Sequence, residues 1–171
     1  ICKDFNDQVD NLLLFCLEKV SQDLNPMKFE ANLFIISCLI SSRPHNIDVY
    51  QLSLTIINGS FHPCVISTAV FILQNMKIDH VNLNKLSLHL LISFPHDVIK
   101  ILSIYLFKKT FKPPNTRIEV PFSDILTALL NLSVSVKDSN AITMLDSLIC
   151  QFPDVFQHFA GQFIGSLIEM W

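Results

Sequence analysis

The sequence has little of what most enzymes and membrane proteins need. It contains three glycines among 171 residues, and 16% of its residues are charged. Neither a glycine-rich phosphate loop nor a Gly-x-Ser-x-Gly nucleophile elbow occurs. The densest apolar run, Leu33–Ile40, falls far short of the roughly 18 residues that a membrane-spanning helix requires. We therefore expect neither of these enzyme classes and no contact with a membrane.

Histidine and cysteine are present but scattered. No two of the six histidines are four residues apart, and none of the five cysteines forms a C-x-x-C pair. Metal sites need such ligands at fixed spacing, so we expect no metal, no cofactor and no catalytic residue. The single cysteines within apolar stretches favour reduced core thiols. Reduced thiols in turn indicate an intracellular protein, either cytoplasmic or nuclear.

Half of the residues are apolar, and they recur at helical spacing along almost the whole chain. Prolines and Asn or Asp residues mark the corners between these stretches. We expect Gly59 to end one helix in the left-handed conformation, and residues 110–120, with Pro113 and Pro114, to form a Pro-rich loop. The pattern predicts an all-α fold of about nine helices, near residues 4–23, 26–42, 46–58, 63–76, 83–94, 95–109, 121–136, 138–151 and 153–171.

Three pairs of these helices share one pattern: an apolar helix, a Phe, a Pro at the corner, and a second apolar helix. The copies cover residues 50–57 with 61–66, residues 84–91 with 94–99, and residues 143–149 with 152–156. The first two copies are 34 residues apart, from Leu52 to Leu86. Self-similarity at a period of some tens of residues is typical of helical solenoids. The pattern resembles HEAT or armadillo-type repeats over most of the chain, although no copy carries a full consensus. The resemblance implies a right-handed α-solenoid of stacked helical hairpins with a scaffold or binding role.

An irregular α-helical bundle is the alternative fold. In either case we expect residues 1–171 to form a single α-helical repeat domain, cut from a longer scaffold protein. The function expected from these features is a non-enzymatic protein–protein interaction module. Its partner would be a helical or extended peptide of another protein, or the flanking part of its own chain, and self-association is a further option.

The last predicted helix carries the candidate partner-binding residues. An aromatic and apolar stripe follows the spacing i, i+3, i+4, and two glycines four residues apart lie on another face. These glycines would either allow a second backbone to approach closely or accommodate the preceding helix. The candidates are Phe156, Phe159, Phe163, Leu167, Trp171, Gly161 and Gly165, and Phe152 begins the stripe.

A basic patch supports a second hypothesis. Lys100, Lys108, Lys109, Lys112 and Arg117 occur close together, and residues 108–117 contain no acid. Such a patch favours contact with phosphate, so the alternative function is a nucleic-acid-associated helical repeat. Basic residues near a helix end also stabilise the helix dipole, and this explanation needs no ligand.

In a solenoid the second helices of successive hairpins lie side by side in a row. Here these are the helices that begin at Pro26, Pro63, Pro95 and Pro153. We expect exposed polar side chains of this row to line a groove. The candidates are His62, Ser67, Gln74, His96, Lys100, Ser103, Gln157 and His158.

Overall fold

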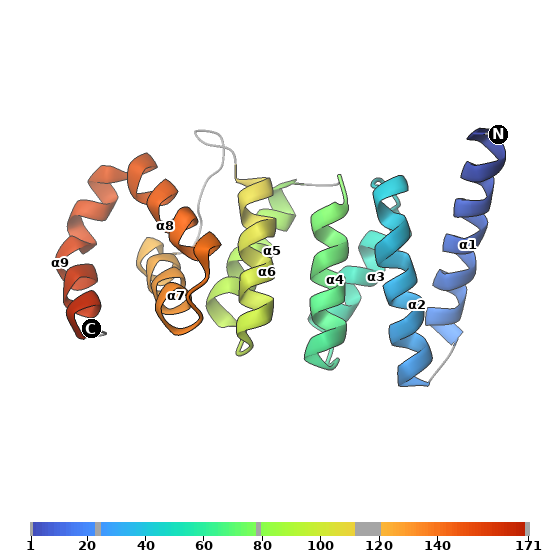
Figure 1. Ribbon diagram of the computed structural model, residues 1–171, viewed down its shortest axis with the longest axis horizontal. Helices are drawn as coiled ribbons and strands as arrows, with labels where there is room; N and C mark the ends of the chain where they lie inside the picture. The colour runs from blue at the N-terminus through green and yellow to red at the C-terminus, as the bar shows by residue number, and fades with distance from the viewer. Residues whose placement is uncertain (1, 23–24, 78–79, 112–120, 170–171) are drawn as a thin grey trace. The chain divides into compact units, whose positions relative to one another are not determined.

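The computed structural model describes residues 2–22, 25–77, 80–111 and 121–169. These residues form nine α-helices, one short 3-10 helix and no strand, which confirms the predicted all-α fold (Figure 1). No helix in the described ranges is long and apolar enough to cross a membrane. The helices are α1 Cys2–Gln22, α2 Pro26–Leu39, η1 Ile40–Ser42, α3 Ile47–Asn58, α4 Pro63–Asn75, α5 His80–Ser93, α6 Asp97–Thr110, α7 Phe122–Ser135, α8 Ser139–Gln151 and α9 Pro153–Glu169.

Side-chain caps explain where several helices begin. The Asn25 side chain accepts a hydrogen bond from the Met27 amide, and the Asn46 side chain accepts one from the Val49 amide, each at 3.0 Å. Asp138 caps α8 by accepting from two amides of its first turn. Such caps satisfy backbone donors that lack a partner inside the helix. Proline occupies the first position of α2, α4 and α9, where its missing N–H costs nothing.

One predicted helix start and one predicted cap conformation were wrong. Helix α6 begins at Asp97, two residues after Pro95, because His96 takes the capping position. Gly59 follows α3 with a φ of −93°, not in the left-handed conformation. Its lack of a side chain matters for another reason, since a Cβ there would lie 2.7 Å from the Phe61 ring. The one described residue with a positive φ is Lys137, at 56°, in the corner after α7.

The described chain divides into two compact units, Ile1–Asp79 and His80–Trp171. In the first unit α1 contacts α2, α3 contacts α4, and α2 also contacts α4. Figure 1 shows α2 and α4 side by side. The buried face of α1 consists of Val9, Leu13, Cys16 and Val20, each about one helical turn from the next.

Two polar links fix the corners of the first unit. The Arg43 guanidinium pairs with both carboxylate oxygens of Asp10 and also donates to the Asn6 carbonyl, which joins the α2–α3 corner to α1. The Lys77 amide donates to the Pro44 carbonyl at 2.7 Å, just beyond the end of α4. Hydrogen bonds and charge from Arg43 hold the pKa of Asp10 below its usual value.

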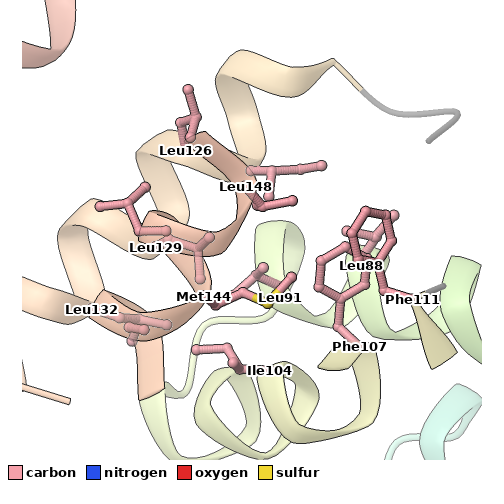
Figure 2. Close-up of a cluster of buried hydrophobic side chains, with 13 residues drawn as sticks. Leu88, Leu91, Ile104, Phe107, Phe111, Leu126, Leu129, Leu132, Met144 and Leu148 are labelled. Carbon is pink, nitrogen blue, oxygen red and sulfur yellow. The ribbon is translucent and has the colours of Figure 1, made fainter. Parts of the chain in front are cut away.

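In the second unit, α5 contacts α6 and α7 contacts α8, while α5 also contacts α7, and α6 contacts α8. The core between them is one cluster of buried side chains (Figure 2). Phe107 and Phe111 stack there with ring centroids 4.9 Å apart. The other members labelled in Figure 2 are Leu88, Leu91, Ile104, Leu126, Leu129, Leu132, Met144 and Leu148.

Helix α9 contacts α7 as well as α8. Because α7 in turn contacts α5, the row that α9 extends is that of α5 and α7. The Phe-Pro corner at Pro153 predicted that α9 would lie in the same row as α6. That prediction is wrong, because a Phe-Pro corner precedes α6 in one row and α9 in the other.

Candidate functional site

The aromatic stripe of α9 packs mainly against its own unit. Phe152, Phe156, Phe159 and Phe163 are half-buried and lie on the core cluster of α5–α8. The Phe152 ring lies 5.8 Å from that of Phe122, and the Phe156 ring lies 5.4 Å from that of Phe163. A role of these side chains in binding a partner therefore has to coexist with a role in the core. Trp171 and the Leu167 side chain lie outside the described residues.

The two glycines of α9 face open space. A Cβ added at Gly161 or Gly165 would meet no atom within 4 Å. The expectation that they accommodate α8 is therefore wrong. Ile164 and Ile168 lie on the same side of the helix and are 55% and 70% exposed. Glycine inside a helix costs about 1 kcal/mol relative to alanine, and no contact within the described chain offsets that cost.

A groove lies between α7 and α9. It is a cavity of about 290 Å³, with Phe159 and Phe163 on the α9 side. The α7 side combines apolar Leu126 and Leu130 with the uncharged polar residues Ser123, Thr127 and Asn131. Two of the predicted partner-binding residues, Phe159 and Phe163, therefore contact the core on one side and the groove on the other.

The structure brings together only part of the predicted basic patch. Lys108 is exposed and Lys109 half-buried, both in the last turn of α6, where they complement the helix dipole. Lys100 lies two turns earlier and pairs with Asp97, with its Nζ 3.8 Å from the carboxylate. Lys112, Arg117 and the rest of the Pro-rich loop from residue 112 lie outside the described residues.

We predicted that exposed polar side chains on the second helix of each hairpin would line a groove. That prediction is wrong in the first unit, because the exposed face of α2 and α4 is mostly apolar. We call this surface the α2–α4 face, and it lies over a cavity of about 360 Å³. Phe34 is 63% exposed and Met27 81%. Its members are Met27, Ala31, Phe34 and Cys38 on α2 and Cys64, Thr68 and Phe71 on α4, all at one-turn spacing and all exposed except Thr68, which is half-buried. The exposed Glu30 side chain also lines the cavity.

Helices α2 and α4 run parallel under this face. Their N-terminal ends meet where Phe29 stacks on Phe61, with ring centroids 5.5 Å apart. The bond from Lys77 to Pro44 joins the chain just past their C-terminal ends. Two parallel helices present two parallel ridges of side chains with a shallow groove between them.

Helix α2 is apolar on both of its sides. Leu33 and Ile36 are fully buried, while Met27 and Phe34 face outward. A helix that is apolar all round is normally buried on every side. In α2 the only charged residues are Lys28 and Glu30 in its first half, and α4 has none. The face from Phe34 onward therefore offers solvent no charged group of either helix.

The sequence contained a usable indication of this face. The apolar run Leu33–Ile40 is the densest in the chain, and a run without a polar side predicts a helix buried on two sides. What the sequence did not reveal is that one of those sides would lie beside α4 and remain uncovered.

No arrangement of side chains among the described residues indicates catalysis or metal binding. No group of three or more His, Cys, Asp or Glu side chains there could hold a metal ion. Of the described cysteines, only Cys16 is buried, and its burial raises the pKa of the thiol. Cys38, Cys64 and Cys150 are exposed free thiols, so the expectation that all the cysteines are core residues is wrong. The Cys2 side chain lies outside the described residues.

Comparison with known proteins adds no homologue to this description. No family model, curated protein or solved structure matches the chain.

Proposed function

We propose that this chain is a non-enzymatic protein-interaction module that binds an apolar helix of a partner protein on the α2–α4 face. The observation that carries the proposal is the exposure of Met27, Phe34 and Phe71 together on a face where the described cavity lining includes a single charged residue, Glu30. Soluble proteins rarely expose contiguous apolar patches of this kind unless the patch meets a partner. The helical hairpins would form a right-handed solenoid of the HEAT or armadillo type, within a longer scaffold.

A helix is the partner that fits this surface best. The exposed side chains form ridges spaced by three or four residues along two parallel helices, and a third helix fills such a groove with anchors at the same spacing. The groove presents few polar groups, so an occupant whose backbone hydrogen bonds are already satisfied internally loses least on binding. Burying one large apolar side chain contributes about 1.5–3 kcal/mol, so Met27, Phe34 and Phe71 together can anchor a specific complex.

The exposed cysteines support an intracellular setting, cytoplasmic or nuclear. Cys38 and Cys64 lie on the α2–α4 face itself and are unpaired, as thiols are in reducing compartments.

Capture of partners by matched variants tests the proposal. The 171-residue chain, its Phe34→Asp variant and its Leu14→Asp variant would be used as baits and the bound proteins quantified by mass spectrometry. Leu14 lies on α1 and is 59% exposed, close to the 63% of Phe34, so it controls for a charge added on an exposed apolar position. We expect the wild type and Leu14→Asp to retain the same specific partners.

The Phe34→Asp variant should lose those partners by roughly 30-fold or more, the effect of removing a binding hot spot. Circular dichroism should show unchanged helicity, because neither side chain is buried. Retention of the same partners by all three baits would contradict the proposal.

A nucleic-acid-associated function is the second candidate, and it has less support. The observation in its favour is the exposed Lys108 beside Lys109 at the end of α6. The pairing of Lys100 with Asp97 weakens it, since Lys100 then lacks a free charge for a phosphate.

A further inference from the structure

We infer that the groove between α7 and α9 is a second binding site, independent of the α2–α4 face, and that it takes an extended peptide segment. The groove differs from the α2–α4 face in its chemistry. One wall is aromatic, from Phe159 and Phe163, and the other carries a ladder of uncharged polar side chains, Ser123, Thr127 and Asn131. Its volume of about 290 Å³ is near the lower end of the roughly 300–1,000 Å³ found for ligand clefts.

Thr127 stands out among the helical threonines. The hydroxyls of Thr55, Thr68, Thr110 and Thr143 each donate to a backbone carbonyl in the preceding turn of their own helix. In the described part of the chain, the Thr127 hydroxyl has no such partner and lines the groove instead. A hydroxyl that is not engaged with its own helix is available both to donate and to accept.

Within the residues that the structure describes, the Asn131 side chain likewise makes no bond to its own helix, unlike those of Asn32 and Asn75. The side-chain amides of Asn32 and Asn75 donate to the carbonyl four residues earlier. Across the described ranges, the Asn131 side chain makes no such bond, although its backbone carbonyl accepts from the Ser135 hydroxyl. Its carboxamide offers a donor and an acceptor together, the same pair that a peptide unit needs.

The spacing of this ladder matches an extended chain. Residues four apart in a helix are about 6 Å apart along its axis, and alternate residues of an extended strand are about 6.6 Å apart. Thr127 and Asn131 can therefore pair with peptide groups on alternate residues of a segment lying along α7. The side chains of such a segment project roughly perpendicular to these hydrogen bonds, so those on one face can pack on Phe159 and Phe163 while those on the other face meet solvent.

The polar ladder also decides against a helical occupant. A helix satisfies its backbone groups internally, so its backbone would offer the Thr127 hydroxyl and the Asn131 amide no partners, and an apolar face of that helix would bury them without any. Each buried polar group left without a hydrogen bond costs about 1–3 kcal/mol. Among the described side chains that line the groove none is charged, so the segment should be apolar at the position facing α9 and need no charge of its own.

A displayed library of random linear peptides, selected on the immobilised 171-residue chain, provides the probe. Selected peptides would then be measured against Thr127→Val and Asn131→Leu. The matched control is Thr143→Val, an exposed threonine on α8 whose hydroxyl donates to the Ser139 carbonyl at 2.8 Å. We expect groove-binding peptides to lose about tenfold in affinity with Thr127→Val and none with Thr143→Val.

Replacing single backbone amides of a selected peptide by esters tests the extended conformation. Affinity should fall on ester substitution at two alternate residues of the peptide, i and i+2. The inference is overturned if selection yields no peptide that depends on Thr127 or Asn131, or if the dependent peptides bind as helices without loss from ester substitution. It is equally overturned if Thr127→Val changes the oligomeric state of the free chain, since the groove would then be an interface between copies.

Discussion

The α2–α4 face and the face formed by α6 and α8 show how two similar helix pairs can present different surfaces. In both units the second helices of successive hairpins contact each other. The exposed residues of α6 and α8 include the charged Lys108 and Asp146 as well as apolar Val98, which is 63% exposed, and the Asn140 side-chain amide donates a hydrogen bond of 2.6 Å to the Tyr105 hydroxyl. The α2–α4 face carries Phe34 and Phe71, and neither helix has a charged residue from Phe34 onward.

Contact between successive second helices therefore does not require an outer face without charge. Helices α6 and α8 contact each other although charged side chains lie among their exposed residues, so that contact does not by itself explain the uncharged apolar ridges of α2 and α4 from Phe34 onward.

The largest expected effect separates two adjacent residues of α2. Leu33 is fully buried and Phe34 is 63% exposed. Leu33→Ala should lower the free energy of unfolding by about 2–5 kcal/mol, while Phe34→Ala should change it by less than about 0.5 kcal/mol. Chemical denaturation followed by circular dichroism measures both. Equal losses for the two variants would show that Phe34 is a core residue and that the α2–α4 face is not free.

The glycines of α9 provide the next effect, with the opposite sign. Because a Cβ at Gly161 or Gly165 meets no atom within 4 Å, each Gly→Ala change should stabilise the free chain by about 0.5–1 kcal/mol. The control is Gly59→Ala, which should destabilise, because its Cβ would lie 2.7 Å from the Phe61 ring and 3.1 Å from the Thr55 carbonyl oxygen. Destabilisation by Gly161→Ala would reveal a close contact that the described chain does not contain.

Some features of the fold could be predicted from the sequence and others could not. Local chemistry located the helices well: Asn25, Asn46 and Asp138 cap where the sequence placed helix starts, because a cap depends only on neighbouring residues. The α2–α4 face was missed because Phe34 and Phe71 are 37 positions apart, and only the packing of α2 on α4 makes them neighbours. Likewise, the Phe-Pro corner before α9 is a local feature, whereas the row that α9 joins depends on contacts with α7.

A smaller effect concerns the link between α1 and the α2–α3 corner. Arg43 lowers the pKa of Asp10, so the folded state favours the carboxylate. The resulting stability is present above the unfolded pKa of about 3.9 and is lost as the pH falls through the lower, folded pKa. Asp10→Asn should therefore flatten the acid side of the stability profile measured by thermal denaturation at different pH values. Arg43→Met should have the same effect, and an unchanged profile in both variants would contradict the link.

The smallest expected effect is that of the basic residues on partner capture. Reversing Lys108, Lys109, Lys112 and Arg117 to Glu should leave binding at the α2–α4 face unchanged, because α2 and α4 hold its contacts. The same variant should show no loss of affinity for a nucleic acid measured across a range of salt. A strong, salt-dependent loss would instead favour the nucleic-acid function.

Three native thiols can measure whether a partner covers the α2–α4 face. Cys38 and Cys64 are exposed on that face, whereas Cys150 is exposed on α8 in the other unit. Alkylation rates would be compared between the free chain and its complex with a captured partner. We predict that the rates at Cys38 and Cys64 fall about tenfold or more while that of Cys150 is unchanged, a factor that corresponds to about 1.4 kcal/mol of protection. Unchanged rates at Cys38 and Cys64 in a stable complex would contradict the proposal.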